Sequence, residues 1–503
     1  MFNRNACCLM PAFFCWLLFG DEAILKAAEI QSIQIIHNAK SFKPGSPASG
    51  LALGETGLII STQAASAEYL SPGLANDFHF NAVGAHWLAE FERSGTLEVS
   101  LRVSEDGEHW GSWILIPPDE EPIAALTEDG RANPFAGETA GALAFVNPRS
   151  RYIQYRLKLQ SSNPASVVIK RMSLNIINSA DGPDVMATIK SRGSHNLTQN
   201  TTGIPKPFMF KRSQWGARPP KYAYTYTIAG HIAFHHTAGV SDYNVGSVDD
   251  CAARVRAIQV FHMDTNGWND IGYNYAICRL GHIFQAREDD NDTNDVHGAH
   301  DGHNAGSMGV ANLGYFHPPY NHKPTPQLLN ALYRLLAWKC DERKINPLTA
   351  SLYQAYGGVV SHIYGHREVR ATACPGDTLF VLKQSIRDSV ARIIAASQTS
   401  VTDRSGAQPA SPSLLRSHPN PFSLSTAATI TFELSKTEMV ALRVYNSLGQ
   451  MVRILQEGPM PAGRHQLLWN GADHQGRILP AGLYFYRLST SKQSQQLKVL
   501  VVK

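Results

Sequence analysis

Two neighbouring histidines and a distant histidine–cysteine pair are the residues of this chain whose types and spacing could do chemistry. His235 and His236 close the apolar run "HIAFHH", His366 follows a glycine in "IYGHREV", and Cys374 stands in "TACPG". Imidazole and thiolate groups are good zinc ligands, and three protein ligands leave a fourth position for water. The spacing fits no zinc finger, and ligands from distant segments are typical of a catalytic site. On residue types alone, separate structural roles remain the alternative.

The two neighbouring histidines are expected to play different roles. If "HIAFHH" is extended, successive side chains point to opposite faces of the strand. His235 and His236 then cannot both enter one site. One can bind a metal while the other packs or supports it.

The segment that carries these residues mixes strand and helix signals. "HIAF" is a strand candidate, and "YNYAICRLGHIFQAR" predicts a hairpin that turns at Gly281. Ser247 opens a helix in a capping-box pattern, Thr325 precedes a proline at a second helix start, and a last helix is expected over about 378–394. Alternating strands and helices indicate an α/β domain over 205–395. The first helix carries an inner stripe at helical spacing: Cys251, Val255, Ile258 and His262.

The flanking regions have the period-two pattern of antiparallel sheets. "TLEVSLRVSEDG" and "RYIQYRLKLQ" alternate apolar with polar residues, and many such runs over 30–178 predict a β-sandwich. Trp110 and Trp113 fit a sugar-binding surface or core packing, and the usual burial of tryptophan favours the core. A second, small sandwich is expected over 413–503. Residues 179–204 and 396–412 are polar and aperiodic, so they predict flexible linkers and a central domain that folds and acts alone.

Composition and the N-terminus limit the class of protein. The chain has 503 residues, so several domains are expected, and its net charge of +4 does not indicate a nucleic-acid partner. Arg4 precedes an apolar run to Gly20, which predicts a secretory signal over 1–28 and a secreted or cell-surface protein. A retained anchor and a buried segment are the alternatives. Four of the seven cysteines lie beyond this signal, too few for a disulfide scaffold.

Residues 209–380 resemble the peptidoglycan recognition protein and type 2 N-acetylmuramoyl-L-alanine amidase family. The matching motifs stand in the family's order: "RSQWGARP", "HHTAG", "RAIQVFHM", "GWNDIGYNY", "GHIFQAR", "GAHDGHN", "SMGVANLG", "GHREV" and "TACPG". The resemblance implies a mixed β-sheet flanked by helices, with a groove that holds one zinc ion. The whole chain is then a multidomain protein, with a central α/β zinc amidase domain between an N-terminal β-sandwich and a C-terminal Ig-like β-sandwich.

The resemblance also implies the site residues. It places the zinc ligands at His235, His366 and Cys374, and it makes Tyr273 in "IGYN" catalytic. Thr372, two residues before the cysteine, is expected to assist the oxyanion. No carboxylate in these motifs clearly fits a general base. Contacts with the substrate are expected at the remaining matched positions: His236, Arg287, His300 and Asn304.

The implied function is a secreted zinc-dependent amidase that cleaves the bond between N-acetylmuramic acid and L-alanine of peptidoglycan. The alternative is a non-catalytic peptidoglycan-binding module at the cell surface. Non-catalytic receptors of the family lack the cysteine that is present here as Cys374, so the enzyme is favoured. The segment before Arg287, "FQAR", departs from many relatives. A helix-anchored disulfide of relatives uses a partner that is absent here, so free thiols at Cys251 and Cys278 fit as well as a bridge, and Cys340 is unassigned.

The C-terminal region has its own resemblance. "HPNPFSLSTAATITFELSK", "VYNSLGQMVRIL" and "GLYFYRL" are similar to Ig-like sorting domains of type IX secretion and to flagellar-hook-capping-type domains. This implies export through outer-membrane secretion machinery, followed by release or attachment at the surface. A plain accessory sandwich is the alternative.

Overall fold

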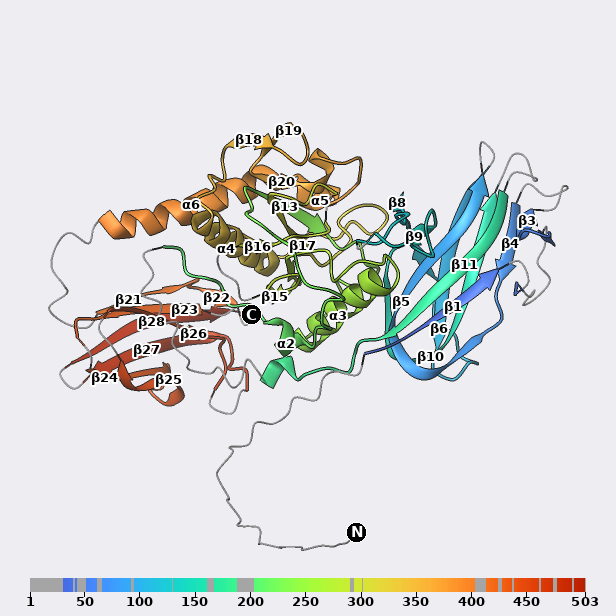
Figure 1. Ribbon diagram of the computed structural model, residues 1–503. Coiled ribbons are helices and arrows are strands. Elements are labelled where there is room, and N and C mark those ends of the chain that lie inside the picture. The colour runs from blue at the N-terminus through green and yellow to red at the C-terminus, as the bar shows by residue number, and fades with distance from the viewer. Residues whose placement is uncertain are drawn as a thin grey trace, which may run out of the picture.

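The computed structural model of the chain describes residues 30–502, except 39–40, 43–50, 61–65, 92–94, 129, 161–166, 188–202, 290–293, 301, 403–412, 424–427, 437, 461–462, 474–476 and 491–492. The predicted signal segment 1–28 lies outside the described residues. An N-terminal β-domain, a central α/β domain and a C-terminal β-domain follow one another along the molecule (Figure 1). Within the described residues, no helix combines the length and apolarity that a membrane span requires.

The N-terminal domain is built from antiparallel strand pairs around three long strands. β10 (Ala144–Gln160) pairs with β5 (Leu74–Phe91) and β6 (Thr96–Ser104), and β11 (Val167–Asn178) also pairs with β5. The alternate residues Ile153, Tyr155, Leu157 and Leu159 of β10 are buried, as the period-two pattern predicts, although Gln154 between them is also buried. A sandwich of two packed sheets remains a prediction. The shorter strands are β1 (Gln31–Asn38), β2 (Leu51–Leu53), β3 (Leu58–Ile60), β4 (Ser66–Leu70), β7 (Ile114–Ile116), β8 (Pro118–Pro122) and β9 (Thr139–Gly141).

The central domain contains a mixed sheet in the order β15-β14-β17-β13-β20. The pairs of β13 with β17 and β20, and of β14 with β17, are parallel, whereas β14 and β15 form the predicted antiparallel hairpin. The strands are β13 (His231–His236), β14 (Tyr275–Ile277), β15 (Ile283–Gln285), β17 (Ser307–Asn312) and β20 (Ile363–Gly365). Small two-stranded ladders join β12 (Tyr226–Thr227) to β16 (Asp295–Val296) and β18 (Ala350–Tyr353) to β19 (Gly358–Ser361).

Helices cover both faces of this sheet. α4 (Pro326–Glu342) and α6 (Lys383–Thr402) share a core with Ile232 and Phe234 of β13, while α3 (Val248–Asp264) packs against the other face. The predicted caps are confirmed, because Ser247 accepts from Asp250 N–H and Thr325 from Leu328 N–H. The predicted last helix is two elements, α5 (Asp377–Phe380) and α6, and α6 continues into the expected second linker. Short α2 (Arg212–Trp215) and η2 (His366–Glu368) complete the domain.

The N-terminal and central domains share one hydrophobic core, which differs from the expectation of independent domains. Phe261 of α3 lies over β5, where a Cβ on Gly84 would come within 2.4 Å of its ring. Phe145 N–H donates to Val240 C=O, and Val240 N–H donates to Leu143 C=O, both at 2.9 Å. Figure 1 shows α3 between the central sheet and the strands β5 and β11.

The segment after β11 is packed rather than flexible where the structure describes it. Ser179 C=O accepts from the buried Arg256 guanidinium at 2.8 Å, and Val185 N–H donates to Asp249 at 2.8 Å. The expectation of a linker that starts at residue 179 was therefore wrong for residues 179–187, because side chains of α3 bind backbone groups at both ends of this segment.

A disulfide joins Cys251 of α3 to Cys278 at the end of β14. It ties the helix to the central sheet, and it decides between the bridge and the free thiols that the sequence left open. Cys340 and Cys374 are buried and take no part in a disulfide.

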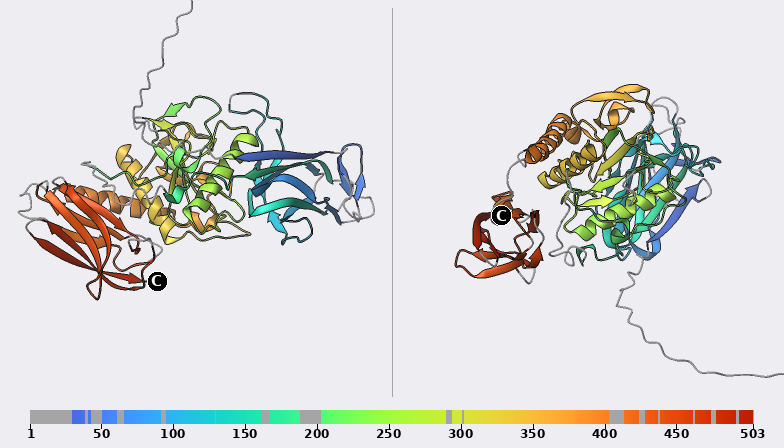
Figure 2. Two further views of the ribbon diagram at one scale, coloured as in Figure 1. Left: turned by 90° about the horizontal axis from the view of Figure 1, so that it is seen from below. Right: turned by 60° about the vertical axis from the view of Figure 1, so that its left-hand side comes forward.

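The C-terminal domain consists of two sheets around Trp469. One has the order β21-β23-β26 and the other β22-β28-β27-β24-β25, with only β22 and β28 parallel among the described pairs. Figure 2 shows this domain as a separate body beyond the central domain. Its strands are β21 (Ser413–His418), β22 (Phe422–Ser423), β23 (Ala428–Leu434), β24 (Glu438–Asn446), β25 (Met451–Met460), β26 (Gly463–Trp469), β27 (Gly482–Thr490) and β28 (Ser494–Val502).

Candidate metal centre

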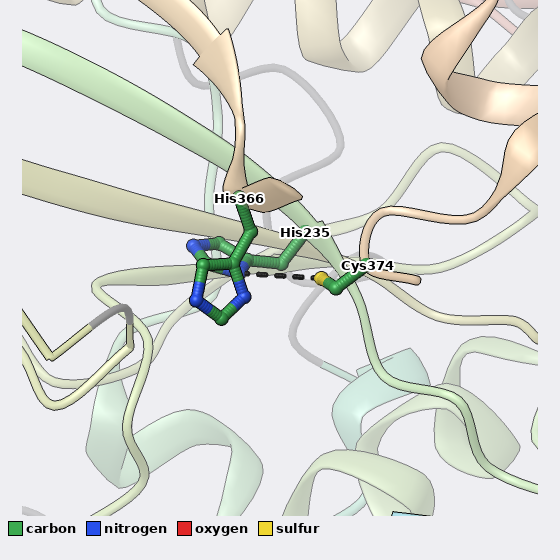
Figure 3. Close-up of side chains that lie close together, drawn as sticks. All are labelled: His235, His366 and Cys374. Atoms are coloured by element: carbon green, nitrogen blue, oxygen red, sulfur yellow. Dashed lines mark hydrogen bonds between the residues drawn. The ribbon is translucent and has the colours of Figure 1, made fainter. Parts of the chain in front are cut away.

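His235, His366 and Cys374 lie together although they come from three segments. One nitrogen or sulfur atom from each lies within 4.8 Å of those of the other two. The Cys374 Sγ is 3.5 Å from the His235 Nδ1 (Figure 3). Ligands of a tetrahedral zinc site with ordinary bond lengths are separated by about 3.4–3.7 Å. The donor set and this separation therefore fit a zinc ion.

The parallel pairing of two strands brings these ligands to one edge of the sheet. His235 lies at the end of β13, and β20 pairs with β13 and leads directly into His366. The loop that carries Cys374 is tied to the same turn, because Arg367 N–H donates to the Cys374 carbonyl at 2.9 Å. Strand pairing and this bond therefore bring the three ligands close together.

The surroundings favour the neutral form of the His235 ring. Burial lowers its pKa well below the ordinary value, and the neighbouring His366 and His300 lower it further. A neutral imidazole keeps the lone pair that a metal requires. The cluster is thus ready to accept a cation.

His236 is not part of the ligand cluster. Its ring packs near Tyr315, with ring centroids 5.8 Å apart, and only 7% of the residue is exposed. Burial, followed by nearby His317 and Arg367, lowers its pKa to about 3. The two histidines thus have different neighbours, while their different roles and a substrate contact at His236 remain predictions.

Tyr273 and Thr372 both border the ligands. The Tyr273 ring lies 5.4 Å from the His235 ring, centroid to centroid. The Thr372 hydroxyl oxygen accepts a hydrogen bond from Cys374 N–H at 3.1 Å, which leaves its own O–H able to donate. The catalytic roles expected of both residues remain predictions.

His300 contacts the ligand His235, and Asn304 contacts His300. The His300 Nδ1 lies 3.1 Å from the His235 Nε2. The backbone N–H of His300 donates to the Asn304 Oδ1 at 2.7 Å. Because His300 is only 6% exposed, it is placed to orient His235. Its predicted contact with substrate, and that of Asn304, remain predictions.

Arg287 lies behind the tyrosine and not among the ligands. It is 2% exposed, and its guanidinium pairs with Glu128 of the N-terminal domain. The same group donates to the carbonyls of Asp270 and Ile271 at 2.9 and 2.7 Å. Its predicted substrate contact remains a prediction, while its described contacts are structural.

Sequence reasoning missed His262 as a neighbour of the site. Its ring lies 5.6 Å from the Tyr273 ring and 4.5 Å from the Trp268 ring, and its Nδ1 accepts from Gly272 N–H at 3.1 Å. Burial lowers its pKa to about 3. The helical spacing of the sequence places His262 on the inner stripe of the helix. The sequence does not show that this stripe brings His262 next to Tyr273.

Comparisons with known proteins identify two regions of the chain that match known families. The sequence profile of the N-acetylmuramoyl-L-alanine amidase family matches residues 226–377, and that of the FlgD Ig-like domain matches residues 420–494. The chain is 33% identical to peptidoglycan-recognition protein LB of Drosophila melanogaster over 179 residues, which are 35% of this chain and 68% of that protein.

A mammalian amidase and a solved structure are also similar to this chain. An N-acetylmuramoyl-L-alanine amidase of Sus scrofa is 29% identical over 313 residues, which are 58% of this chain and 46% of that protein. The solved structure of wild-type Drosophila peptidoglycan-recognition protein LB is 32% identical and covers 35% of this chain and 91% of its own, with a TM-score of 0.28.

Proposed function

Because the chain belongs to the N-acetylmuramoyl-L-alanine amidase family, we propose that it is a zinc-dependent amidase that cleaves between N-acetylmuramic acid and L-alanine of peptidoglycan. Family membership supports amide hydrolysis and peptidoglycan as the class of substrate. The proposal goes further in two respects: the chain binds zinc, and it cleaves peptidoglycan and does not only bind it.

The convergence of His235, His366 and Cys374 is the observation that carries the proposal. A bound zinc ion would supply Lewis acidity toward the amide carbonyl and toward the attacking water. The three side chains would hold it, and the burial of His235 and Cys374 would lower the local dielectric constant, which makes electrostatic effects larger.

The chain's own donors would stabilise the oxyanion that forms during attack. The hydroxyl of Tyr273 would donate to this developing charge, and the Thr372 hydroxyl would be a second donor. The bond from Cys374 N–H to Thr372 fixes the orientation of that hydroxyl. His300 would hold the ring of His235 in one orientation.

The place of action follows from the substrate class, since peptidoglycan lies outside the cytoplasmic membrane. We propose that the chain is secreted or displayed at the cell surface after export by its N-terminal segment. The C-terminal domain, which matches the FlgD Ig-like profile, would then be the element recognised by outer-membrane secretion machinery.

Mass spectrometry of peptidoglycan after incubation with the protein tests the function. Release of stem peptides with a free L-alanine amino group is expected. Metal analysis in parallel should give about one zinc per chain, with loss in Cys374→Ser. Binding to peptidoglycan without any released peptide would identify a non-catalytic recognition module and overturn the proposal.

A further inference from the structure

Two arginines and two tryptophans form a partly exposed cluster on the outer face of β6 and β10. Arg102 lies on β6 and Arg156 on β10, while Trp110 and Trp113 lie in the connection from β6 to β7. Neither tryptophan is buried, so the core packing favoured by the sequence was wrong. We call these four residues the Arg/Trp face; Figure 1 shows β6 and β10 in the N-terminal domain, away from α6.

A fixed turn places the tryptophans over the strand. Asp106 accepts hydrogen bonds from the N–H groups of Glu108 and His109, at 2.9 and 2.8 Å. These bonds and the His109 side chain hold the pKa of the Asp106 carboxyl well below its usual range. The chain then runs back along β6, with a bridge between Ser104 and Trp110.

The indoles and guanidiniums stack alternately. The Arg102 guanidinium carbon lies 5.1 Å from the Trp110 ring centre and 4.6 Å from that of Trp113, and Arg156 lies 4.5 Å from Trp113. Trp113 therefore contacts both cations. Such stacking holds a guanidinium by its flat faces and leaves the N–H groups at its edge available.

The two cations have no counter-ion within the part of the chain that the structure describes. Neither guanidinium pairs with a carboxylate there, and the Arg156 Nε has no hydrogen-bond partner. Nearby acids are engaged elsewhere, since Glu98 pairs with Lys158 and Glu105 with Arg149.

The two positive charges of Arg102 and Arg156 also repel each other. The pKa of Arg102 is lowered by burial and by the charge of Arg156. The Arg102 Nε donates to Gln154 at 2.8 Å, which fixes the direction of its remaining N–H groups. If the stack had a purely structural role, a carboxylate beside these charges would make it more stable. No such carboxylate pairs with them among the described residues.

We propose that the Arg/Trp face binds carboxylate groups of peptidoglycan and is a second, non-catalytic contact with the polymer. The inference rests on the proposed function for the identity of the polymer. Planar carboxylates match the edge of a guanidinium in a bidentate geometry. Stem peptides of peptidoglycan carry such groups, and the neighbouring indoles offer apolar surface to the attached sugars and peptides.

Binding to purified peptidoglycan sacculi tests the proposal. Every protein compared carries Tyr273→Phe, so that the sacculi stay intact. The double variant Arg102→Gln/Arg156→Gln is compared with Arg487→Gln, whose guanidinium is stacked on Tyr445 at 4.7 Å in the C-terminal domain. Thermal unfolding checks the fold, and the single variant Arg156→Gln replaces the double variant if the double variant does not fold. Chitin and sacculi with amidated carboxyl groups are the reference polymers.

The double variant should bind sacculi about tenfold more weakly, because charge-assisted contacts are lost. The Arg487→Gln control should bind unchanged, and the difference should vanish on amidated sacculi and on chitin. Equal binding of the double variant and control to sacculi would overturn the proposal, as would an equal loss on chitin, which would indicate recognition of sugars alone. Failure of the amidase proposal would instead appear as absent cleavage by the native chain, with the binding difference intact.

Discussion

The Glu128 carboxylate of the N-terminal domain holds the Arg287 guanidinium of the central domain through two hydrogen bonds of 2.9 and 2.8 Å. Arg287 in turn donates to the carbonyl of Ile271, and its backbone N–H donates to the carbonyl of Tyr273 at 2.7 Å. One ion pair therefore connects the N-terminal domain to the segment that carries the proposed catalytic tyrosine. Glu128 is a positioning residue in this arrangement.

Glu128→Ala should lower turnover without removing zinc. Arg287 would lose its partner and the Tyr273 segment its support, so we expect about a tenfold fall in kcat with little change in KM. The loss of stability should be about 1–3 kcal/mol, since the Arg287 side chain is 3% exposed but that of Glu128 is 26% exposed. Glu90→Gln, which removes the exposed pair with Lys170, is the control and should change neither value. Unchanged kinetics in Glu128→Ala would remove the positioning role.

A fragment of residues 205–395 should be unstable by itself. Removal of the N-terminal domain would expose Phe261 and the rest of the α3 face that shares its core. We expect aggregation, or a thermal midpoint well below that of the fragment 30–402, which retains the interface. Removal of residues 413–503 from the full chain is the matched control and should leave the central domain folded. Equal midpoints for fragments 205–395 and 30–402 would show that the interface adds no stability.

Local features of the sequence predicted much of the central domain. The caps at Ser247 and Thr325 depend on the next few residues, and the separation of His235 from His236 follows from strand alternation alone. The pair of Glu128 and Arg287 is separated by 159 positions, and no local pattern connects them. Trp110 is a similar case, because its exposure depends on how a turn folds over a neighbouring strand.

The two adjacent histidines should respond differently to replacement by alanine. His235→Ala should lose zinc and activity, because its Nδ1 faces Cys374. His236→Ala should keep zinc and lose about 1–3 kcal/mol of stability, since its buried ring packs beside Tyr315. Metal analysis and thermal unfolding of both variants make the comparison. Loss of zinc in His236→Ala would show that the wrong member of the pair has been assigned.

Tyr273→Phe should keep the fold and the zinc while turnover falls. Removal of one preorganised donor to an oxyanion typically lowers the rate by about 100- to 1,000-fold. Thr372→Ala should lose less, because its hydroxyl is one donor among several, although the bond from Cys374 N–H is also lost. Steady-state kinetics on a soluble muropeptide, with zinc content measured on the same samples, separate the two variants. Wild-type turnover in Tyr273→Phe would exclude the tyrosine from the mechanism.

The buried carboxyl of Asp242 should make stability depend on pH. Its Oδ2 accepts from the Thr237 hydroxyl and from Gly314 N–H, while its Oδ1 has no partner within the described residues. Burial raises its pKa to about 7, against the opposing effect of these hydrogen bonds and of Arg254. The folded chain thus holds this proton more tightly than the unfolded chain, whose Asp pKa is about 3.9. The contribution to stability is present below about pH 4 and is lost as the pH rises through about 7.

Asp242→Asn removes this titration and should therefore gain stability relative to the wild type as the pH rises from about 4 to about 7. The gain should reach at most a few kcal/mol and then stay constant at higher pH. Other buried groups, such as His236, titrate in both proteins and cancel in the difference. Thermal unfolding of the two proteins at several pH values from about 4 to 9 provides the measurement. A stability difference that does not change over this range would show that Asp242 is ionised throughout, with its charge stabilised by Arg254 and the surrounding N–H groups.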